Sequence, residues 1–297
     1  MYPRSFEYFA PRSVEEAVSL LSVHGEEAKV LAGGQSLIPL MKLRMSGPRF
    51  IIDINRVSGL SGIREQDGMM VFGALTRHAE IEESAAVKAR FPIMHDAACV
   101  IGDVQIRNRG TIAGSLVHAD PAGDWSPALL ALDGRVKCVS PRGDRTLGIE
   151  ELEVDAYTTS LNTDEVVTQV MVPLPASGSG GAYIKFERKA GDFAVASVAV
   201  QVSLGKDGAC SRLGVGLGAV GLTAFRAHSA ESILVGKNVT DALVREAAGA
   251  AQAAADPFED IRGSVDYKRH LVGVLFRRAF DIAVRRARGE EVQIGHV

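Results

Sequence analysis

The sequence predicts an α+β fold in which two small α/β units are followed by a C-terminal part made of a sheet with helices. Three observations lead to this prediction. Helical and extended patterns alternate through the first half of the chain, a Pro-, Ser- and Gly-rich linker interrupts it at residues 175–181, and the strand-like segments beyond are followed by two helical patterns. We expect one domain over residues 1–176, with units at about 1–55 and 56–176, and a second over residues 182–290.

The first unit is predicted to begin with a capped helix. Ser13 and Glu16 have the spacing of a capping box, and the helix that follows them ends near Gly25. The other elements expected in the first two units are a strand at 29–31, a short helical or irregular segment at 39–44, strands at 50–54 and 69–75, and helices from about 79 and over 92–100.

Beyond residue 134 the pattern changes to strands and turns. Strands are expected at 136–139 and 166–172, a half-buried strand of alternating valines at 198–204, a glycine-rich strand at 212–223, and helices over 241–255 and 266–288. The last helix carries an apolar stripe of Val272, Phe276, Ala279 and Ala283. Residues 262–288 also hold eight Lys or Arg against two Asp, which fits either a solvated basic face or an interface with an acidic partner subunit.

Two glycine runs carry most of the functional information. They are Ala32-Gly33-Gly34-Gln35-Ser36-Leu37 and Thr111-Ile112-Ala113-Gly114-Ser115, and each follows residues predicted to be extended and precedes a possible helix start. Either run alone is typical of an ordinary turn. Together, two loops with exposed backbone amides suit the two phosphates of a dinucleotide. Neither run is followed by Lys and then Ser or Thr, so a P-loop is excluded.

A third segment, His118 to Trp125, follows the second run directly. Asp124 is either the N-cap of a helix or an acceptor for the hydroxyls or ring N–H of a ligand, and the sequence leaves both open. His118 and Asp120 lack a third ligand nearby, which favours a polar loop histidine over a metal site.

The run Gly216-Leu-Gly218-Ala-Val-Gly221 matches the G-x-G-x-x-G fingerprint of nicotinamide dinucleotide sites. That fingerprint needs a helix opening within it, whereas a strand-like pattern continues through Phe225. We therefore interpret these glycines as positions where a strand packs closely against its neighbour.

Composition excludes several classes of function. A net charge of -3 gives no footprint for nucleic acid, and no apolar run approaches the length of a transmembrane segment. The cysteines Cys99, Cys138 and Cys210 lie far apart, which excludes zinc or iron–sulfur ligation by this chain alone and favours a reducing, cytoplasmic location. No nucleophile motif or metal motif is present, so we expect a cofactor to supply the chemistry.

The segment Leu31–Arg44, LAGGQSLIPLMKLR, resembles the first flavin loop of the medium subunits of molybdenum hydroxylases, nearest the type found in aerobic carbon monoxide dehydrogenase and within the family of the xanthine dehydrogenase FAD domain. Thr111–Pro121, TIAGSLVHADP, resembles the second flavin loop of that family. Residues 182–194 and 260–271 are similar to its patterns as well, so the resemblance covers nearly the whole chain.

The resemblance implies an FAD-binding domain of the vanillyl-alcohol-oxidase type, with two α/β subdomains, followed by an α/β C-terminal domain. It places the flavin diphosphate between the two loops and Asp124 near the flavin. Val167 and Lys185 match positions that approach the isoalloxazine ring, and Phe193 matches a position against that ring. The FAD-binding positions that it implies are Ala32, Gly33, Gly34, Gln35, Ser36, Leu37, Thr111, Ile112, Ala113, Gly114, Ser115, Asp124, Val167, Lys185 and Phe193.

The chain departs from the family pattern at two of these positions. Ala113 replaces the first of two glycines in the second loop, which puts one diphosphate contact in doubt. Phe193 stands where relatives often have tyrosine, so an aromatic face is kept and a hydroxyl is lost.

The function implied is that of an FAD-carrying electron-transfer subunit. Substrate would be oxidised at a molybdopterin centre on a large subunit, and electrons would pass through the 2Fe-2S clusters of a small subunit to this FAD and an external acceptor. A dimer of heterotrimers is expected, with no catalytic residue and no metal ligand on this chain. The alternatives are a self-contained FAD-dependent oxidase or dehydrogenase and a flavin-free assembly subunit. The substrate and the acceptor stay open.

Overall fold

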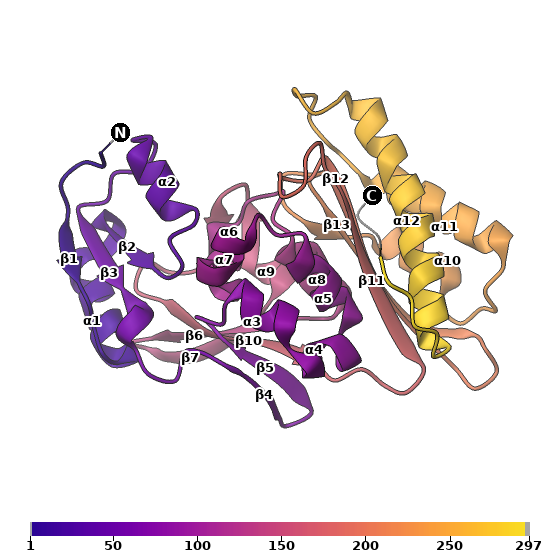
Figure 1. Ribbon diagram of the computed structural model, residues 1–297, viewed down its shortest axis with the longest axis horizontal. Helices are drawn as coiled ribbons and strands as arrows, with labels where there is room; N and C mark the ends of the chain where they lie inside the picture. Colours follow the sequence, from indigo (N-terminus) through magenta and orange to yellow (C-terminus); the bar gives the residue numbers. More distant parts are fainter. Residues whose placement is uncertain (1, 295–297) are drawn as a thin grey trace.

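The computed structural model describes residues 2–294, and its first unit is built on a small parallel sheet (Figure 1). The sheet has the order β1 (Glu7–Phe9), β3 (Phe50–Asp53), β2 (Ala28–Leu31). The helical elements are α1 (Val14–His24), α2 (Leu37–Lys42) and the short 3₁₀ turns η1 (Gly25–Glu27) and η2 (Ile54–Arg56). Ser13 caps α1 as predicted, while the Glu16 carboxylate accepts from the Arg12 amide, one residue before the cap, at 2.8 Å.

The second unit has an antiparallel sheet of five strands covered by helices. Its order is β4 (Ile63–Gln66), β5 (Met69–Gly73), β10 (Val166–Pro173), β6 (Arg135–Ser140), β7 (Gly143–Gly148). The other elements are α3 (His78–Glu83), α4 (Ala85–Arg90), α5 (Pro92–Cys99), α6 (Val104–Arg109), α7 (Ile112–His118), α8 (Trp125–Ala131), α9 (Ile149–Leu152) and the pair β8 (Glu153–Asp155) and β9 (Thr158–Thr159).

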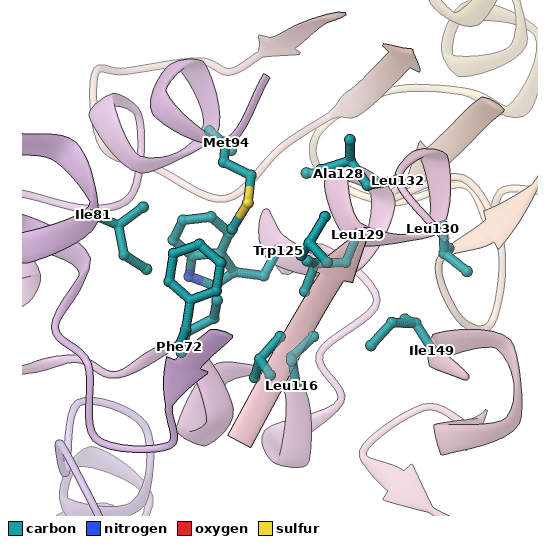
Figure 2. Close-up of a cluster of buried hydrophobic side chains, with 14 of the residues drawn as sticks. Phe72, Ile81, Met94, Leu116, Trp125, Ala128, Leu129, Leu130, Leu132 and Ile149 are labelled. Carbon is teal, nitrogen blue, oxygen red and sulfur yellow. The ribbon is translucent and has the colours of Figure 1, made fainter. Parts of the chain in front are cut away.

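Trp125 lies at the centre of the core between these helices and the sheet (Figure 2). Its side chain is fully buried beside Phe72 and Met94, and its indole N–H donates to Nδ1 of His78 at 3.0 Å. Burial lowers the pKa of His78 to about 3, so this ring is neutral and accepts the bond. The bond satisfies both polar groups and fixes the start of α8 against α3.

The third unit is an antiparallel sheet of β11 (Ser179–Phe186), β12 (Ala196–Leu204), β13 (Cys210–Gly218) and β14 (Phe225–Arg226). Its helices are α10 (His228–Leu234), α11 (Asp241–Ala254) and α12 (Val265–Ala287). Helix α12 packs on β11 and β12, while α5 and α8 of the second unit pack against the same sheet (Figure 1).

The third unit corrects two sequence predictions. Strand β12 is buried on both sides rather than half-buried, and even its polar Gln201 is only 3% exposed. The predicted linker is shorter than residues 175–181, because Gly180 and Gly181 belong to β11. A Cβ on Gly180 would lie 2.2 Å from the carbonyl oxygen of Ala283 in α12, so this glycine permits close contact between strand and helix.

The glycine-rich strand packs closely on its neighbour, as interpreted from the sequence. A Cβ on Gly216 would lie 2.0 Å from the Pro127 carbonyl oxygen in α8, and one on Gly214 would meet Ala131 in the same helix. The segment after Gly218 forms a turn and not a helix, which rules out the fingerprint geometry, although the strand ends earlier than the predicted residue 223.

Helix α12 presents the predicted apolar stripe to the sheet and its basic side outward. The four stripe residues Val272, Phe276, Ala279 and Ala283 are fully buried, and Arg277 and Arg285 are exposed. Two members of the basic stretch face inward instead: Lys268 is 4% exposed and pairs with Asp260 at 2.9 Å, and Arg286 forms a salt bridge with Asp96 of α5 at 2.5 Å. Within residues 2–294, no helix is long and apolar enough to cross a membrane.

Candidate cofactor-binding site

The two glycine loops lie against each other. The first, residues 32–36, joins β2 to α2, and the second begins at Thr111, the N-cap of α7. A Cβ on Gly33 would lie 2.3 Å from the Arg109 carbonyl oxygen and 2.8 Å from the Gly110 Cα, so only glycine fits at this contact. A Cβ on Gly114 would lie 3.6 Å from that of Ala32. The loops therefore meet backbone to backbone.

Both loops offer backbone amides for a ligand. Gly34 has a φ of +76°, and among the residues described here the amides of residues 34–37 donate no hydrogen bond. In the second loop the Thr111 hydroxyl accepts from the Gly114 amide at 3.2 Å, which leaves the Ala113 amide without an acceptor within residues 2–294. Adjacent free amides of this kind suit the oxygens of a diphosphate, so the loops fit the FAD that the sequence predicts.

The setting of the second loop differs from the sequence prediction. It follows helix α6 rather than an extended segment, and Thr111 makes only a single β-bridge, with Arg77. The side chain of Ala113 is 4% exposed and belongs to the buried core. Its methyl group is therefore accommodated by core packing.

Asp124 is the centre of a buried polar cluster and does not cap α8. It occupies the N-cap position, but its carboxylate accepts from the Tyr183 hydroxyl at 2.6 Å and forms a salt bridge with Lys185 at 3.3 Å. Burial raises the pKa of Asp124, and the Lys185 ammonium opposes that effect. The prediction that the Asp124 side chain caps the helix is therefore wrong. The fold places Asp124 in direct contact with Lys185, another predicted site residue.

Lys185 is 1% exposed at its side chain and is bonded on several sides. Its ammonium donates to the carbonyl oxygens of Val100 at 2.7 Å and of Asp192 at 3.0 Å, and it pairs with Glu187 at 3.1 Å. Because Asp192 directly precedes Phe193, these bonds also fix the segment that carries the aromatic side chain, which is 51% exposed.

The remaining predicted residues lie around the second loop. A Cβ on Gly123 would be 4.0 Å from the Ser115 hydroxyl, so the turn leading to Asp124 adjoins this loop. Val167 shares the core with Ile112 and supports α7 from β10. His118 ends α7 with its ring beside Tyr157, and within residues 2–294 no group of three His, Cys, Asp or Glu could hold a metal.

The sequence analysis missed the side chains that hold the loops in place. Asn55 donates to the Ala32 carbonyl oxygen at 2.7 Å, and Arg77 bonds both Asn55 and the Arg109 carbonyl oxygen. Tyr183, the partner of Asp124, was missed as well. The available signal was weak: Asn55 and Arg77 each follow shortly after the end of a predicted strand.

Comparison with known proteins identifies the family of the chain. The family model of the FAD-binding domain in molybdopterin dehydrogenase matches residues 4–175, and that of the CO dehydrogenase flavoprotein C-terminal domain matches residues 181–283. Subunit alpha of the 6-hydroxypseudooxynicotine dehydrogenase complex of Paenarthrobacter nicotinovorans is 40% identical over the full length of both chains. The carbon monoxide dehydrogenase medium chain of Hydrogenophaga pseudoflava is 42% identical over 96% of this chain and 99% of the relative.

The structural comparison gives the same result. A solved structure of carbon monoxide dehydrogenase from Hydrogenophaga pseudoflava superposes with a TM-score of 0.94 and 43% identity, covering 96% of this chain and 99% of that one. The mixed α/β fold is therefore that of the carbon monoxide dehydrogenase medium subunit. The chain belongs to the family of FAD-binding medium subunits of the molybdopterin dehydrogenases, or molybdenum hydroxylases.

Proposed function

We propose that this chain carries FAD in a heteromeric molybdenum hydroxylase and passes electrons from the iron–sulfur clusters of a partner subunit to an external acceptor. The observation that carries the proposal is the pair of loops packed backbone to backbone with free amides around Gly34 and Ala113. Bound FAD supplies a centre that takes electrons singly and releases them in pairs. The chain itself binds and orients this group.

Each part of the site has a separate task in this proposal. The loop residues 32–37 and 111–115 hold the diphosphate through backbone amides and small hydroxyls. Asp124 and Lys185 form a buried, hydrogen-bonded pair beside the ring site, where Lys185 keeps the carboxylate compensated in a nearly dry environment. Phe193 presents its aromatic face to the ring, and Val167 supports the site from the core.

The domain division and the partners belong to the same proposal. We assign residues 1–176 to a flavin domain of the vanillyl-alcohol-oxidase type, with subdomains around the parallel and the antiparallel sheet, and residues 182–290 to a C-terminal domain. The partners are a large molybdopterin subunit and a small iron–sulfur subunit in a cytoplasmic dimer of heterotrimers. Two relatives whose sequence identity to this chain is about the same, 40% and 42%, are named for 6-hydroxypseudooxynicotine and for carbon monoxide. We therefore propose no single substrate.

The test is the absorbance spectrum and the released nucleotide of the full chain, purified alone and with its co-expressed large and small subunits after supply of FAD. Stoichiometric FAD supports the proposal. Bleaching of the flavin by a small substrate in the chain alone would indicate a self-contained oxidase or dehydrogenase. A colourless protein in both preparations would reject the flavin role and leave an assembly role.

A further inference from the structure

A pair of side chains links the two loops. Asn55, in the turn after β3, bonds the first loop, and Arg77, at the start of α3, bonds both Asn55 and the chain just before the second loop. We propose that Asn55 and Arg77 are positioning residues that set the spacing of the two loops and thereby the affinity for FAD. This inference rests on the proposed function, and we call the pair the loop brace.

The loop brace is a continuous series of hydrogen bonds between two carbonyl oxygens. The Asn55 side-chain amide donates to the Ala32 carbonyl at 2.7 Å, and its oxygen accepts from Nη2 of Arg77 at 2.7 Å. Nη1 of the same guanidinium donates to the Arg109 carbonyl at 2.5 Å. That carbonyl is the group against which Gly33 packs. The brace therefore joins the loops beside their point of contact.

Each end of the loop brace is fixed by its own unit. On the first unit, the Asp53 carboxylate accepts from the side-chain amide of Asn55 at 2.6 Å and from the Tyr8 hydroxyl at 2.7 Å. On the second unit, the backbone around Arg77 pairs with the start of the second loop: the His78 amide donates to Gly110, at 3.1 Å. Each of the two residues is therefore anchored in its own unit before it reaches across to the other.

The loop brace also brings positive charge to the loops. Arg77 is partly buried, and no carboxylate in residues 2–294 lies within salt-bridge distance of its guanidinium. Its hydrogen bonds go to neutral oxygens of Asn55 and Arg109, so its charge is not compensated by a direct partner. A diphosphate bound between the loops is attracted by this charge, which gives Arg77 a second effect in the same direction.

The experiment measures the dissociation constant of FAD in the complex of the full chain with its large and small subunits, after removal of the flavin. The variants are Asn55→Ala, Arg77→Met, their combination, and Arg77→Lys. The matched control is Arg269→Met, because Arg269 also donates to a backbone carbonyl, that of Ala255, at 2.9 Å, but in α12. Melting of the flavin-free protein is recorded for every variant.

We expect Asn55→Ala and Arg77→Met each to weaken FAD binding by about tenfold or more, since charge-assisted bonds are lost. The combined variant should be weaker than Arg77→Met by no more than about twofold, because both changes break one link. Arg77→Lys keeps the charge but cannot bond both oxygens, so its affinity should lie between those of the wild type and Arg77→Met. Arg269→Met should leave FAD affinity unchanged.

Two results would overturn the loop brace. In the first, Asn55→Ala and Arg77→Met bind FAD as tightly as Arg269→Met does, and only their melting temperatures are lowered. The pair would then be merely structural. The other is a combined loss equal to the product of the single losses, which would make the two residues independent. Failure of the wild-type complex to bind FAD would reject the proposed function itself, a different outcome from either.

Discussion

Glu153 is predicted to make the stability of this chain depend on pH near neutrality. The residue begins β8 and is 7% exposed, and its carboxylate accepts a hydrogen bond from Ser126, the second residue of α8. Burial raises the pKa of Glu153 from 4.5 to about 7, and nearby Asp120 reinforces the effect while the Ser126 bond opposes it.

The direction and size of the effect follow from this raised pKa. The folded chain binds a proton at Glu153 more tightly than the unfolded chain, so the resulting stabilisation is complete below pH 4.5 and is lost as the pH rises to about 7. The loss amounts to about 3 kcal/mol. Glu153→Gln stays neutral at every pH, keeps the shape and retains an oxygen that can accept from Ser126.

The assay compares the melting temperatures of wild type and Glu153→Gln at matched flavin content across this pH range. Near pH 4.5 the two should melt together, and at about pH 8 the variant should melt roughly 6 °C higher, at about 2 °C per kcal/mol for a chain of this size. Glu259→Gln, at an exposed position, controls for the change in net charge. A difference between wild type and Glu153→Gln that stays constant with pH would refute the reasoning.

Three further predictions concern the cofactor site. Gly33→Ala should abolish stoichiometric FAD in the purified complex, because its Cβ would meet backbone at 2.3 Å, whereas Gly249→Ala, with open space around it, should retain FAD. Lys185→Met should destabilise the chain by about 3 kcal/mol in denaturant titrations by leaving Asp124 buried without its cation, and an unchanged midpoint would contradict this. Phe193→Ala should weaken FAD binding several-fold in titrations. Because the side chain is 51% exposed, the melting temperature of the flavin-free protein should stay unchanged. An FAD affinity equal to that of the wild type would exclude a contact between Phe193 and the ring.

Local signals in the sequence were sufficient for elements such as α1 and α12, whereas β1, β4 and β11 were not predicted. The Ser13 cap and the stripe through Phe276 depend only on residues a few positions apart, so their pattern is visible without tertiary structure. The half-buried interpretation of β12 failed for the opposite reason. Gln201 is polar and suggested a solvent-facing side, but helices from another unit cover it.

The two glycine loops of the candidate site could be recognised from the sequence, but the side chains that hold them in place could not. Glycine runs disclose loops because the backbone conformation itself requires the residue type. Hydrogen bonds to backbone carbonyls leave no pattern in the sequence, because every residue has a carbonyl oxygen. Asn55 and Arg77 bond such oxygens, those of Ala32 and Arg109. The Asp124 carboxylate does not cap the helix but accepts from Tyr183, 59 positions later, a partner that no local pattern could indicate.

The contact between β13 and α8 sets an order for biosynthesis. Asp124 directly precedes helix α8. The strand that packs on that helix and Lys185, which compensates the carboxylate, emerge from the ribosome much later. We therefore expect the nascent chain to hold both glycine loops before it has a finished pocket. FAD capture would then follow the synthesis of β13, and a product truncated before residue 179 would stay colourless although both loops are intact.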